Sequence, residues 1–215
     1  MIGNMSQVLR RHLSHTPLWS LARGIVDPLR VSRWKLRGRP LPPPAGYKRD
    51  TLRQYARRYQ LKTMVETGTF HGETGFAMKD IFARFVTIEL SPDLHAAAVR
   101  RLSRFPNIEC RLGDSSVVLP ELLQTIEEPC LFWLDAHYSG FYTAKGELET
   151  PISAELGAVL RHKVRNHIVL IDDARCFDGT HDYPRLAELR ESVLSLRPDM
   201  AFTVEHDIIR ITPGN

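Results

Sequence analysis

Acidic side chains directly follow two strongly apolar segments of the sequence. Asp135 comes after residues 130–134, and Asp172 and Asp173 come after residues 167–171. Apolar runs of this length are typical of buried parallel strands, and the carboxyl ends of such strands meet at one edge of a sheet. Three carboxylates at one edge repel one another strongly unless protons or a cation intervene. A divalent cation with oxygen ligands, such as Mg²⁺, is the natural occupant of such a site.

A second set of residues surrounds a glycine-rich turn. Residues 61–90 predict a buried strand, a turn with Gly68 and Gly72, a helix from about Glu73, and a second buried strand that ends on Glu89. Glycine lets the main chain approach a ligand closely, and the following helix N-terminus directs backbone N–H groups towards it. The acid that closes the second strand can accept hydrogen bonds from both hydroxyls of a ribose. The pattern therefore indicates half of a nucleotide-binding βαβ unit.

The spacing of the glycines narrows the kind of nucleotide. Gly68, Gly72 and Gly75 form G-x-x-x-G-x-x-G, which differs from the G-x-G-x-x-G of dinucleotide enzymes. Glu66, just before the first glycine, would repel a pyrophosphate but would attract a cationic amino-acid group. We therefore expect a nucleoside with a positively charged tail, and a nicotinamide-dependent oxidoreductase is disfavoured. The alternative is a tight turn of an α/β sheet that binds no ligand.

The segment Glu66–Thr74, ETGTFHGET, resembles the first motif of the class I S-adenosylmethionine-dependent methyltransferases. Its form is most similar to the macrocin-type and catechol-type O-methyltransferases, but Phe70 stands where many relatives have another glycine. Over about residues 60–212, the resemblance implies S-adenosylmethionine as cofactor and a Rossmann-like α/β fold, whose seven-stranded, mostly parallel sheet has one reversed strand and flanking helices. The cofactor site that it implies consists of Glu66, Gly68, Thr69, Phe70, Gly72, Thr74, Glu89, Asp114, Ser115 and Asp135.

Asp114 lies just beyond the third expected strand, residues 107–111. In the resembling family an acid at this place accepts a hydrogen bond from the adenine amino group, so the resemblance assigns that role to Asp114. Asp114 would also serve as the N-cap of the following helix, which begins near Ser115. Both interpretations stay open.

The acidic strand ends also resemble a metal site of the catechol-type relatives. Those enzymes place an Asp after the fourth strand and an Asp-Asn pair after the fifth, a pattern that Asp135 and Asp172 match and Asp173 does not. The resemblance thus implies Asp135, Asp172 and Asp173 as ligands of Mg²⁺. The alternative is a metal-free site, in which Arg175 folds back to neutralise one carboxylate or an aspartate caps the segment that follows.

His137 is the leading candidate for a general base, because imidazole titrates near neutral pH and this histidine stands two residues after Asp135. His137 and Asp135 form the predicted catalytic group. The resemblance implies methyl transfer to a hydroxyl of a small-molecule or glycan-like acceptor, in which bound Mg²⁺ would lower the pKa of that hydroxyl. The alternative from a different functional class is a non-catalytic nucleoside-binding protein that docks through a basic N-terminal arm.

Positive charge is concentrated at the N-terminus. Residues 1–49 hold ten Lys or Arg and one acid, Asp27, whereas the other residues hold 19 basic and 24 acidic side chains. With Trp34 and the proline run after it, this pattern predicts a basic appendage and linker at residues 1–45, ahead of a methyltransferase domain at residues 46–215. The appendage would contact an anionic membrane surface or an acidic partner, or would instead pack over the domain or a neighbouring subunit of a homo-oligomer. Nucleic acid is not expected, because no nucleic-acid-binding motif accompanies the charge.

The sequence carries no signal that indicates export or membrane insertion. Its first residues lack the apolar core of a signal peptide, and no apolar run is long enough to span a bilayer. Cys110, Cys130 and Cys176 lie far apart and are odd in number, which favours reduced, buried thiols. We therefore expect a cytoplasmic protein, with peripheral contact at the membrane surface if the appendage docks there.

Periodicity and capping residues predict the other elements. In the appendage, Thr16 and Pro17 indicate a helix that ends at Asp27-Pro28, and Asp50 indicates the start of a helix at residues 50–60. Further helices are expected at residues 92–104, from Thr150-Pro151 onwards, and at residues 184–196, and strands at residues 85–89, 201–205 and 207–211.

Overall fold

The computed structural model describes residues 17–135 and 150–214. The chain divides into two compact units, Met1–Asp50 and Thr51–Asn215. The first unit contains α2 (Pro17–Leu36) and the start of α3 (Ala45–Arg58), and the second contains the rest of α3 and a β-sheet.

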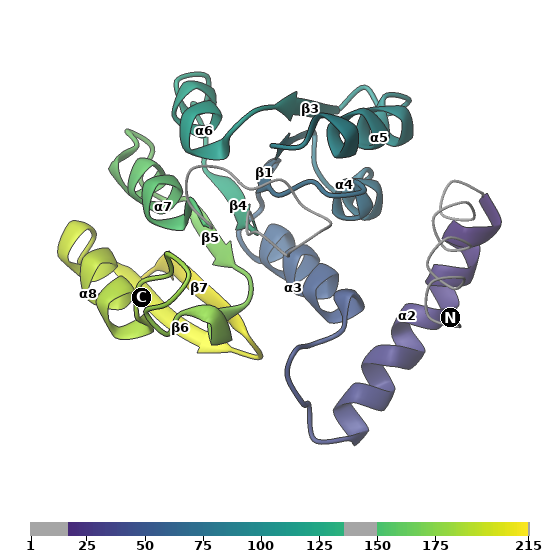
Figure 1. The fold of residues 1–215 in the computed structure, drawn as a ribbon, viewed down its shortest axis with the longest axis horizontal. Coiled ribbons are helices and arrows are strands. Elements are labelled where there is room, and N and C mark those ends of the chain that lie inside the picture. Colours follow the sequence, from purple (N-terminus) through teal and green to yellow (C-terminus); the bar gives the residue numbers. More distant parts are fainter. Residues whose placement is uncertain (1–16, 136–149, 215) are drawn as a thin grey trace. The chain divides into compact units, whose positions relative to one another are not determined.

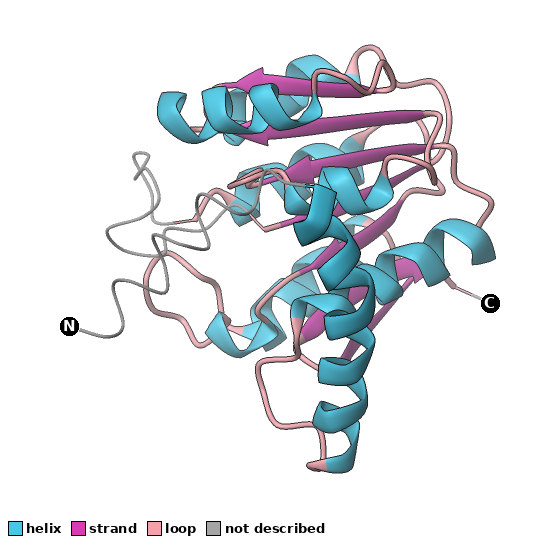
Figure 2. Cartoon of the chain, turned by 90° about the vertical axis from the view of Figure 1, so that its right-hand side faces the viewer, coloured by secondary structure: helices cyan, strands magenta, loops and turns pink. Residues whose placement is uncertain are grey.

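The second unit is built on a seven-stranded sheet in the order β3-β2-β1-β4-β5-β7-β6 (Figure 1). Its strands are β1 (Thr63–Thr67), β2 (Arg84–Glu89), β3 (Ile108–Leu112), β4 (Cys130–Leu134), β5 (Ile168–Ile171), β6 (Met200–Glu205) and β7 (Ile208–Pro213). Strands β1 to β5 pair in parallel, whereas β7 runs antiparallel to both β5 and β6. The strands change direction progressively across the sheet, which has the usual twist (Figure 2). The predicted Rossmann-like fold with one reversed strand is therefore confirmed.

Helices cover both faces of this sheet. They are α4 (Glu73–Met78), α5 (Pro92–Leu102), α6 (Ser115–Leu123), α7 (Ile152–Arg161) and α8 (Leu186–Leu196), and a short 3₁₀ helix, η1 (Ala174–Cys176), follows β5. Apolar side chains of α6, α7 and α8 form one continuous core with the strands, including Val65, Phe132 and Ile171. On the opposite face α4 and α5 pack near β2, where Gly75 lies close to Phe85.

The predicted positions of most elements agree with the structure, for identifiable physical reasons. β4 occupies residues 130–134 as expected, because an unbroken apolar run is buried on both faces of the sheet. α5 begins directly after Ser91, whose hydroxyl accepts a hydrogen bond from the N–H of Leu94 at 3.4 Å. α8 begins two residues later than expected, at Leu186, and the carboxylate of Glu188 accepts the N–H of Arg185 at 3.0 Å just before it.

The predicted end of the first helix is wrong. α2 continues through Asp27-Pro28 and ends at Leu36. Proline cannot donate the usual backbone hydrogen bond inside a helix, but side-chain contacts within this unit offset the loss. The guanidinium of Arg49 donates to the carboxylate of Asp27 at 2.5 Å, and Val31, one turn further on, is buried.

The predicted start of the second helix is also wrong. α3 begins at Ala45, so Asp50 lies inside the helix and is not its N-cap. The last proline of the run, Pro44, ends the extended segment, and its carbonyl accepts a hydrogen bond from the N–H of Tyr47 at 2.8 Å. Proline just before a helix suits the first turn, where N–H groups have no partner within the helix.

Trp34 is buried, as an appendage that packs rather than docks would require. It is only 6% exposed, its ring centre lies 4.7 Å from that of Tyr47, and its indole N–H donates to the carbonyl of Pro40 at 2.7 Å. Trp34 therefore stabilises the first unit internally. Docking of residues 1–45 to an anionic membrane surface, and assembly into a homo-oligomer, stay predictions.

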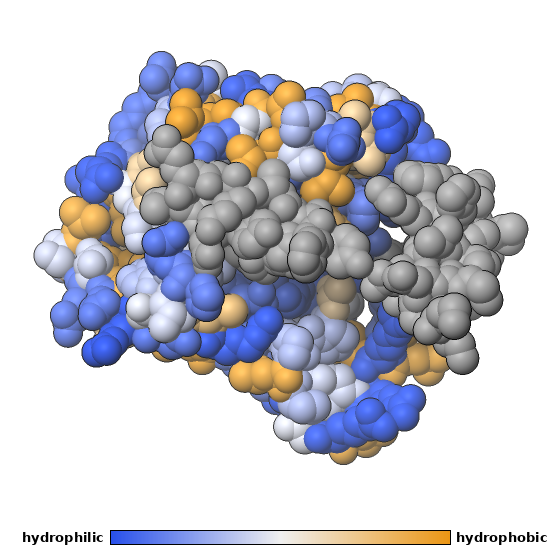
Figure 3. Space-filling model, in the orientation of Figure 1, coloured by the Kyte–Doolittle hydropathy of each residue, from blue (hydrophilic) through white to orange (hydrophobic). Residues whose placement is uncertain are grey.

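Among the described residues, no helix combines the length and the apolar character needed to cross a membrane. On the face drawn in Figure 3, hydrophobic residues are dispersed among hydrophilic ones.

Candidate active site

The carboxyl ends of β1, β4 and β5 lie side by side at one edge of the sheet. Thr67, Leu134 and Ile171 pair across these strands, so the residues that follow them leave the sheet together. The N–H of Asp135 donates to the carbonyl of Thr67 at 3.1 Å, and the N–H of Asp172 donates to that of Leu134 at 3.1 Å. Strands β2 and β3 lie on one side of β1, and β4 and β5 lie on the other, so the order in which the chain adds strands reverses next to β1. Open α/β sheets bind ligands at such a switch point.

The turn after β1 has a backbone that favours glycine. Gly68 and Gly72 have φ angles of 83° and 67°, in the left-handed region. A Cβ atom on Gly72 would lie 2.8 Å from Cδ1 of Leu102. A side chain at position 72 would therefore displace the buried Leu102 and would also strain the left-handed backbone. Phe70, the departure from the family pattern, also has a positive φ of 51°, and its side chain is exposed.

Glu89 joins this turn to the end of β2. One of its carboxylate oxygens accepts the N–H of Phe70 at 2.8 Å, and the other accepts the N–H of Ser91 at 2.9 Å. A carboxylate oxygen can accept more than one hydrogen bond. Glu89 thus orders the turn and keeps acceptor capacity for a ligand hydroxyl at the switch point.

Glu66 is buried below the turn in a network of hydroxyls. Its carboxyl accepts a hydrogen bond from Thr87 at 2.8 Å, and the hydroxyls of Thr87 and Thr69 are 2.6 Å apart. Burial raises the pKa of Glu66 to about 8, the hydroxyls of Thr87 and Thr74 oppose this shift, and the negative charges of Asp135 and Glu89 add to it. Near neutral pH, Glu66 therefore carries a proton for much of the time and can release it when a cation approaches.

Asp114 is the N-cap of α6. Its Oδ1 atom accepts hydrogen bonds from the N–H and the hydroxyl of Ser116 at 2.8 and 2.7 Å. The capping interpretation of Asp114 is thus confirmed, and its contact with adenine stays a prediction. Ser115, the first residue of α6, is buried.

Asp135, Asp172 and Asp173 are brought together as the sequence predicts. One carboxylate oxygen from each lies within 4.8 Å of those of the other two. Asp172 accepts the N–H of Asp173 at 2.9 Å, and Asp173 itself has a positive φ of 55°. Both of these side chains are buried, so their negative charges are poorly screened by water.

Arg175 neutralises part of this acidic cluster, as the metal-free alternative requires. Its guanidinium donates to Asp173 at 2.7 Å and also pairs with Asp207, which lies in the turn between β6 and β7. These two carboxylates raise the pKa of Arg175 against the opposing effect of desolvation, so the side chain stays charged. No ion pair between Arg175 and Asp135 or Asp172 is found in the described part of the chain.

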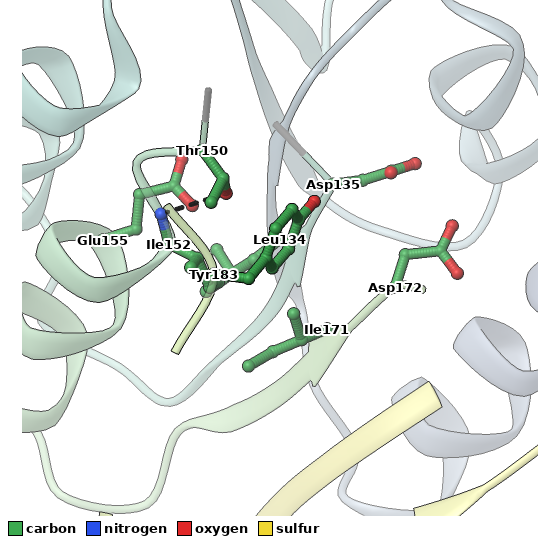
Figure 4. Close-up of a pocket in the computed structure, with 8 residues that line it drawn as sticks. All are labelled: Leu134, Asp135, Thr150, Ile152, Glu155, Ile171, Asp172 and Tyr183. Carbon is green, nitrogen blue, oxygen red and sulfur yellow. Dashed lines mark hydrogen bonds between the residues drawn. The ribbon is translucent and has the colours of Figure 1, made fainter. Parts of the chain in front are cut away.

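A pocket opens beside Asp135 and Asp172, at the ends of β4 and β5 (Figure 4). Its other lining residues are the last residues of these two strands, residues at or just before the start of α7, and one residue before α8: Leu134, Ile171, Thr150, Ile152, Glu155 and Tyr183. The hydroxyl of Tyr183 is directed towards Asp135, and the carboxyl of Glu155 lies beside Thr150 (Figure 4).

Sequence reasoning missed Glu155 and Tyr183 as pocket residues. Glu155 is 1% exposed, and among the described residues neither of its carboxyl oxygens has a hydrogen-bond partner. Burial raises the pKa of Glu155 to about 7, and the nearby hydroxyls of Ser115 and Thr67 oppose the shift. One signal was present in the sequence: Glu155 stands three residues after Ile152, on the apolar side of its helix. No comparable signal marked Tyr183.

His137, the predicted general base, lies outside the described residues. The predicted cofactor residues come from four strand ends. Glu66 and Gly68 belong to β1 and its turn, Glu89 ends β2, Asp114 follows β3, and Asp135 follows β4.

The strand order and the reversed β7 form a Rossmann-like methyltransferase fold. Solved O-methyltransferases share it. TomG from Streptomyces achromogenes, in complex with S-adenosylmethionine, is 19% identical over 88% of this chain and 90% of that chain, with a TM-score of 0.59. An O-methyltransferase from Bacillus cereus, in complex with S-adenosylhomocysteine, is 14% identical over 94% of this chain and 99% of that chain, with a TM-score of 0.59.

The same fold occurs in a third solved methyltransferase. PaMTH1 from Podospora anserina, bound to S-adenosylhomocysteine, is 18% identical over 86% of this chain and 87% of that chain, with a TM-score of 0.54. Searches of protein-family models and of curated proteins gave no match to this sequence. At these identities, the likeness to solved structures establishes the fold.

Proposed function

We propose that this chain is an S-adenosylmethionine-dependent methyltransferase that methylates a hydroxyl of a small-molecule or glycan-like acceptor. The observation that carries the proposal is the carboxylate of Glu89, which accepts the N–H of Phe70 from the glycine turn at 2.8 Å. An acid and a turn of backbone N–H groups thus lie next to each other at the switch point, where nucleosides bind in such sheets. The fold shared with S-adenosylmethionine- and S-adenosylhomocysteine-bound O-methyltransferases supports the proposal.

Each proposed cofactor residue has a distinct part. Glu89 accepts hydrogen bonds from the ribose hydroxyls, and Asp114 and Ser115 hold the base at the start of α6. Glu66 attracts the positively charged amino-acid part from below the turn. Thr69, Phe70, Gly72 and Thr74 complete the turn between these acids.

The reaction requires the protein mainly to align two reactants and to remove a proton. When bound, the donor supplies a methyl group activated by its sulfonium, so that the new oxygen–carbon bond forms as the carbon–sulfur bond breaks and sulfur keeps the electron pair. Asp135 lies at the end of β4 beside the pocket. Asp135 orients the acceptor hydroxyl, and His137 takes its proton.

We further propose that Asp135, Asp172 and Asp173 hold Mg²⁺. The residues fit the ion, because three carboxylate oxygens within 4.8 Å of one another would otherwise repel. When bound there, Mg²⁺ would supply Lewis acidity that lowers the pKa of the acceptor hydroxyl. Since Asp173 already pairs with Arg175 at 2.7 Å, we expect Asp135 and Asp172 to contribute most of the affinity.

Isothermal titration calorimetry with the full-length protein tests the proposed cofactor. We expect S-adenosylhomocysteine to bind with a dissociation constant on the order of micromolar, and NAD⁺ to bind at least about a hundredfold more weakly. The absence of S-adenosylhomocysteine binding, or a preference for NAD⁺, would refute the proposal. If the ligand binds but no methyl is transferred to a broad panel of hydroxylated acceptors, the non-catalytic alternative is favoured.

Ligand binding is expected to be coupled to a proton on Glu66. Its pKa is about 8 in the free protein, and a nearby cation lowers this pKa, so binding of S-adenosylmethionine releases a proton. By linkage, affinity rises as pH increases towards 8, by up to about tenfold per pH unit, and levels off above that pH. Calorimetry in two buffers with different ionisation enthalpies measures the released proton directly.

Glu66→Gln provides the control, because the amide keeps the size of the side chain but cannot ionise. We expect this variant to bind S-adenosylmethionine more weakly and to lose the part of the pH dependence that comes from Glu66. A pH profile of binding that is identical in the two proteins would exclude Glu66 from contact with the charged part of the ligand.

A further inference from the structure

Two histidines lie side by side where α7 ends and β5 begins. His162 is the C-cap of α7, and His167 directly precedes β5. Nδ1 of His162 and Nε2 of His167 are 2.8 Å apart, and the two stacked rings have their centres 5.1 Å apart. The ring of His167 also packs edge to face against that of Phe132, on β4. The pair thus connects α7, β4 and β5 away from the strand ends that form the candidate active site.

Backbone donors fix the position of the proton on each ring. Nδ1 of His167 accepts the N–H of Cys130, the first residue of β4, at 3.1 Å, so the neutral ring carries its proton on Nε2. That proton faces Nδ1 of His162, which also accepts the N–H of Val164 at 3.4 Å. His162 therefore carries its own proton on Nε2, a buried atom without a hydrogen-bond partner among the described residues.

Neither ring can take a second proton without the loss of a hydrogen bond. A proton on Nδ1 of His167 would face the N–H of Cys130. A proton on Nδ1 of His162 would face two donors, the ring N–H of His167 and the N–H of Val164. Buried donors that face each other lose their bond and stay unpaired, which is costly. The arrangement is therefore complete only when both rings are neutral.

The charges on the α7 and α8 side of the pair also oppose protonation. Burial lowers the pKa of His167 to about 4, and the charges of His162 and Arg197 add to this shift. Arg197, which follows α8, is held in place because it donates to the carbonyl of Arg165 at 2.6 Å and pairs with Asp199 at 2.7 Å. A positive charge therefore stays near the rings.

The groups on the β4 side do not offset this effect. The thiol of Cys130 is buried and its pKa is raised to about 12, so it carries no negative charge near neutral pH. Glu128, two residues earlier, accepts the hydroxyl of Thr63 at 2.8 Å. No ion pair joins either ring to an acid in the described part of the chain.

We infer that His162 and His167 form an acid-sensitive latch, which holds the end of α7 to the starts of β4 and β5 while both rings are neutral and releases them when a ring takes a proton. The latch does not depend on the proposed methyltransferase function. The other ends of these three elements lie at the pocket of the candidate active site. Acid therefore loosens the frame of that site through residues that line no part of the pocket.

The latch makes stability depend on pH within a defined window. A histidine in an unfolded chain takes up a proton below about pH 6.5, whereas His167 in the folded protein does so at about pH 4. The contribution of this ring to stability is therefore fully present above about pH 6.5 and is lost as the pH falls towards about 4. Urea unfolding of the full-length protein at pH 7.5 and at pH 5 measures the change in the folding equilibrium constant.

His167→Gln removes the titration and keeps a donor. The NH₂ group of Gln can still donate to Nδ1 of His162, but the side chain cannot ionise. Between pH 7.5 and pH 5, we expect the folding equilibrium constant of the unmodified protein to fall at least about tenfold more than that of the variant. Carboxyls such as Glu66 titrate in both proteins, so the difference reports the ring. His181→Gln, at an exposed histidine, is the matched control and should keep the acid sensitivity of the unmodified protein.

Two-bond ¹H–¹⁵N NMR of the histidine rings tests the arrangement without unfolding the protein. At pH 7.5 we expect both rings to be neutral with the proton on Nε2, and at pH 5 we expect His167 to be neutral still. The signals that disappear in His167→Gln assign the ring of His167. His162→Asn assigns the other ring, and its amide oxygen still accepts the ring N–H of His167.

Three results would overturn the inference. They are equal pH dependence of stability in the unmodified protein and His167→Gln, a proton on Nδ1 of either neutral ring, and a His167 ring that is already protonated at pH 6.5 in the folded protein. If His167→Gln does not fold, His162→Asn still assigns the signals, and the ring spectra of the unmodified protein decide.

Discussion

Replacing Glu89 with Ala is expected to weaken S-adenosylhomocysteine binding at least about tenfold, and up to about a hundredfold. Two effects add in this variant. The ribose hydroxyls lose their acceptor, and the N–H groups of Phe70 and Ser91 lose the carboxylate that orders the glycine turn at 2.8 and 2.9 Å. Isothermal titration calorimetry measures the change, and thermal unfolding shows whether the fold is kept.

Two further variants separate these effects. Glu89→Gln keeps one acceptor oxygen but directs an NH₂ group at a backbone donor, so we expect an affinity between those of the unmodified protein and Glu89→Ala. Glu191→Ala removes an exposed glutamate from α8 and should leave the affinity unchanged. If Glu89→Ala binds S-adenosylhomocysteine as tightly as the unmodified protein, Glu89 does not contact the ligand.

Loss of divalent cations is expected to abolish methyl transfer, and Asp172→Asn is expected to weaken cation binding at least about tenfold. Asp172 is buried, and one of its carboxylate oxygens lies within 4.8 Å of one oxygen of Asp135 and one of Asp173. Removal of its charge therefore takes away a large part of the attraction for a cation. Binding of Mn²⁺ can be followed by electron paramagnetic resonance without knowledge of the acceptor. Once an acceptor is found, activity lost in excess chelator should return with Mg²⁺ or Mn²⁺.

The design of this experiment separates metal from cofactor. Asp172→Asn should impair Mn²⁺ binding much more than S-adenosylhomocysteine binding, because Glu89 and the glycine turn hold the nucleoside elsewhere. Asp178→Asn, at an exposed position six residues further on, is the control. Full activity in excess chelator, or Mn²⁺ binding that Asp172→Asn does not alter, would show that the acidic cluster works without a metal and that Arg175 balances it.

The parts of the fold that could be predicted from the sequence are those set by local patterns. β4 is an unbroken apolar run, and only a strand buried on both faces suits it. Ser91-Pro92 carries its own start signal for α5, because the hydroxyl caps the first turn and the proline needs no N–H partner. These apolar runs also fix where the parallel strands end. Asp135, Asp172 and Asp173 could therefore be expected at one edge of the sheet.

The parts that could not be predicted depend on contacts between distant residues. α2 continues past Pro28, where its contacts within the first unit include the ion pair between Asp27 and Arg49, 22 positions apart. The sequence also suggested that Arg175 could fold back on the aspartates, but not that Asp207 shares it. Glu155 was missed because a single acid among apolar helix positions is usually exposed, and only the structure shows that this one is buried.

The link between Arg175 and Asp207 makes the acidic edge depend on a segment that is synthesised after β1 to β5. Asp207 accepts the backbone N–H of Arg175 at 2.9 Å in addition to the guanidinium, and its carbonyl accepts the N–H of Ala174 at 2.9 Å. The glycine turn, Glu89 and Asp114 all belong to the first half of the domain, and their contacts are complete once β3 and the start of α6 have formed. On the ribosome, where N-terminal segments fold first, the nucleoside side of the site can therefore form while η1 still lacks its partner. The acidic edge is fixed only after the hairpin of β6 and β7 has been released, so the two sides of one crevice mature at different times.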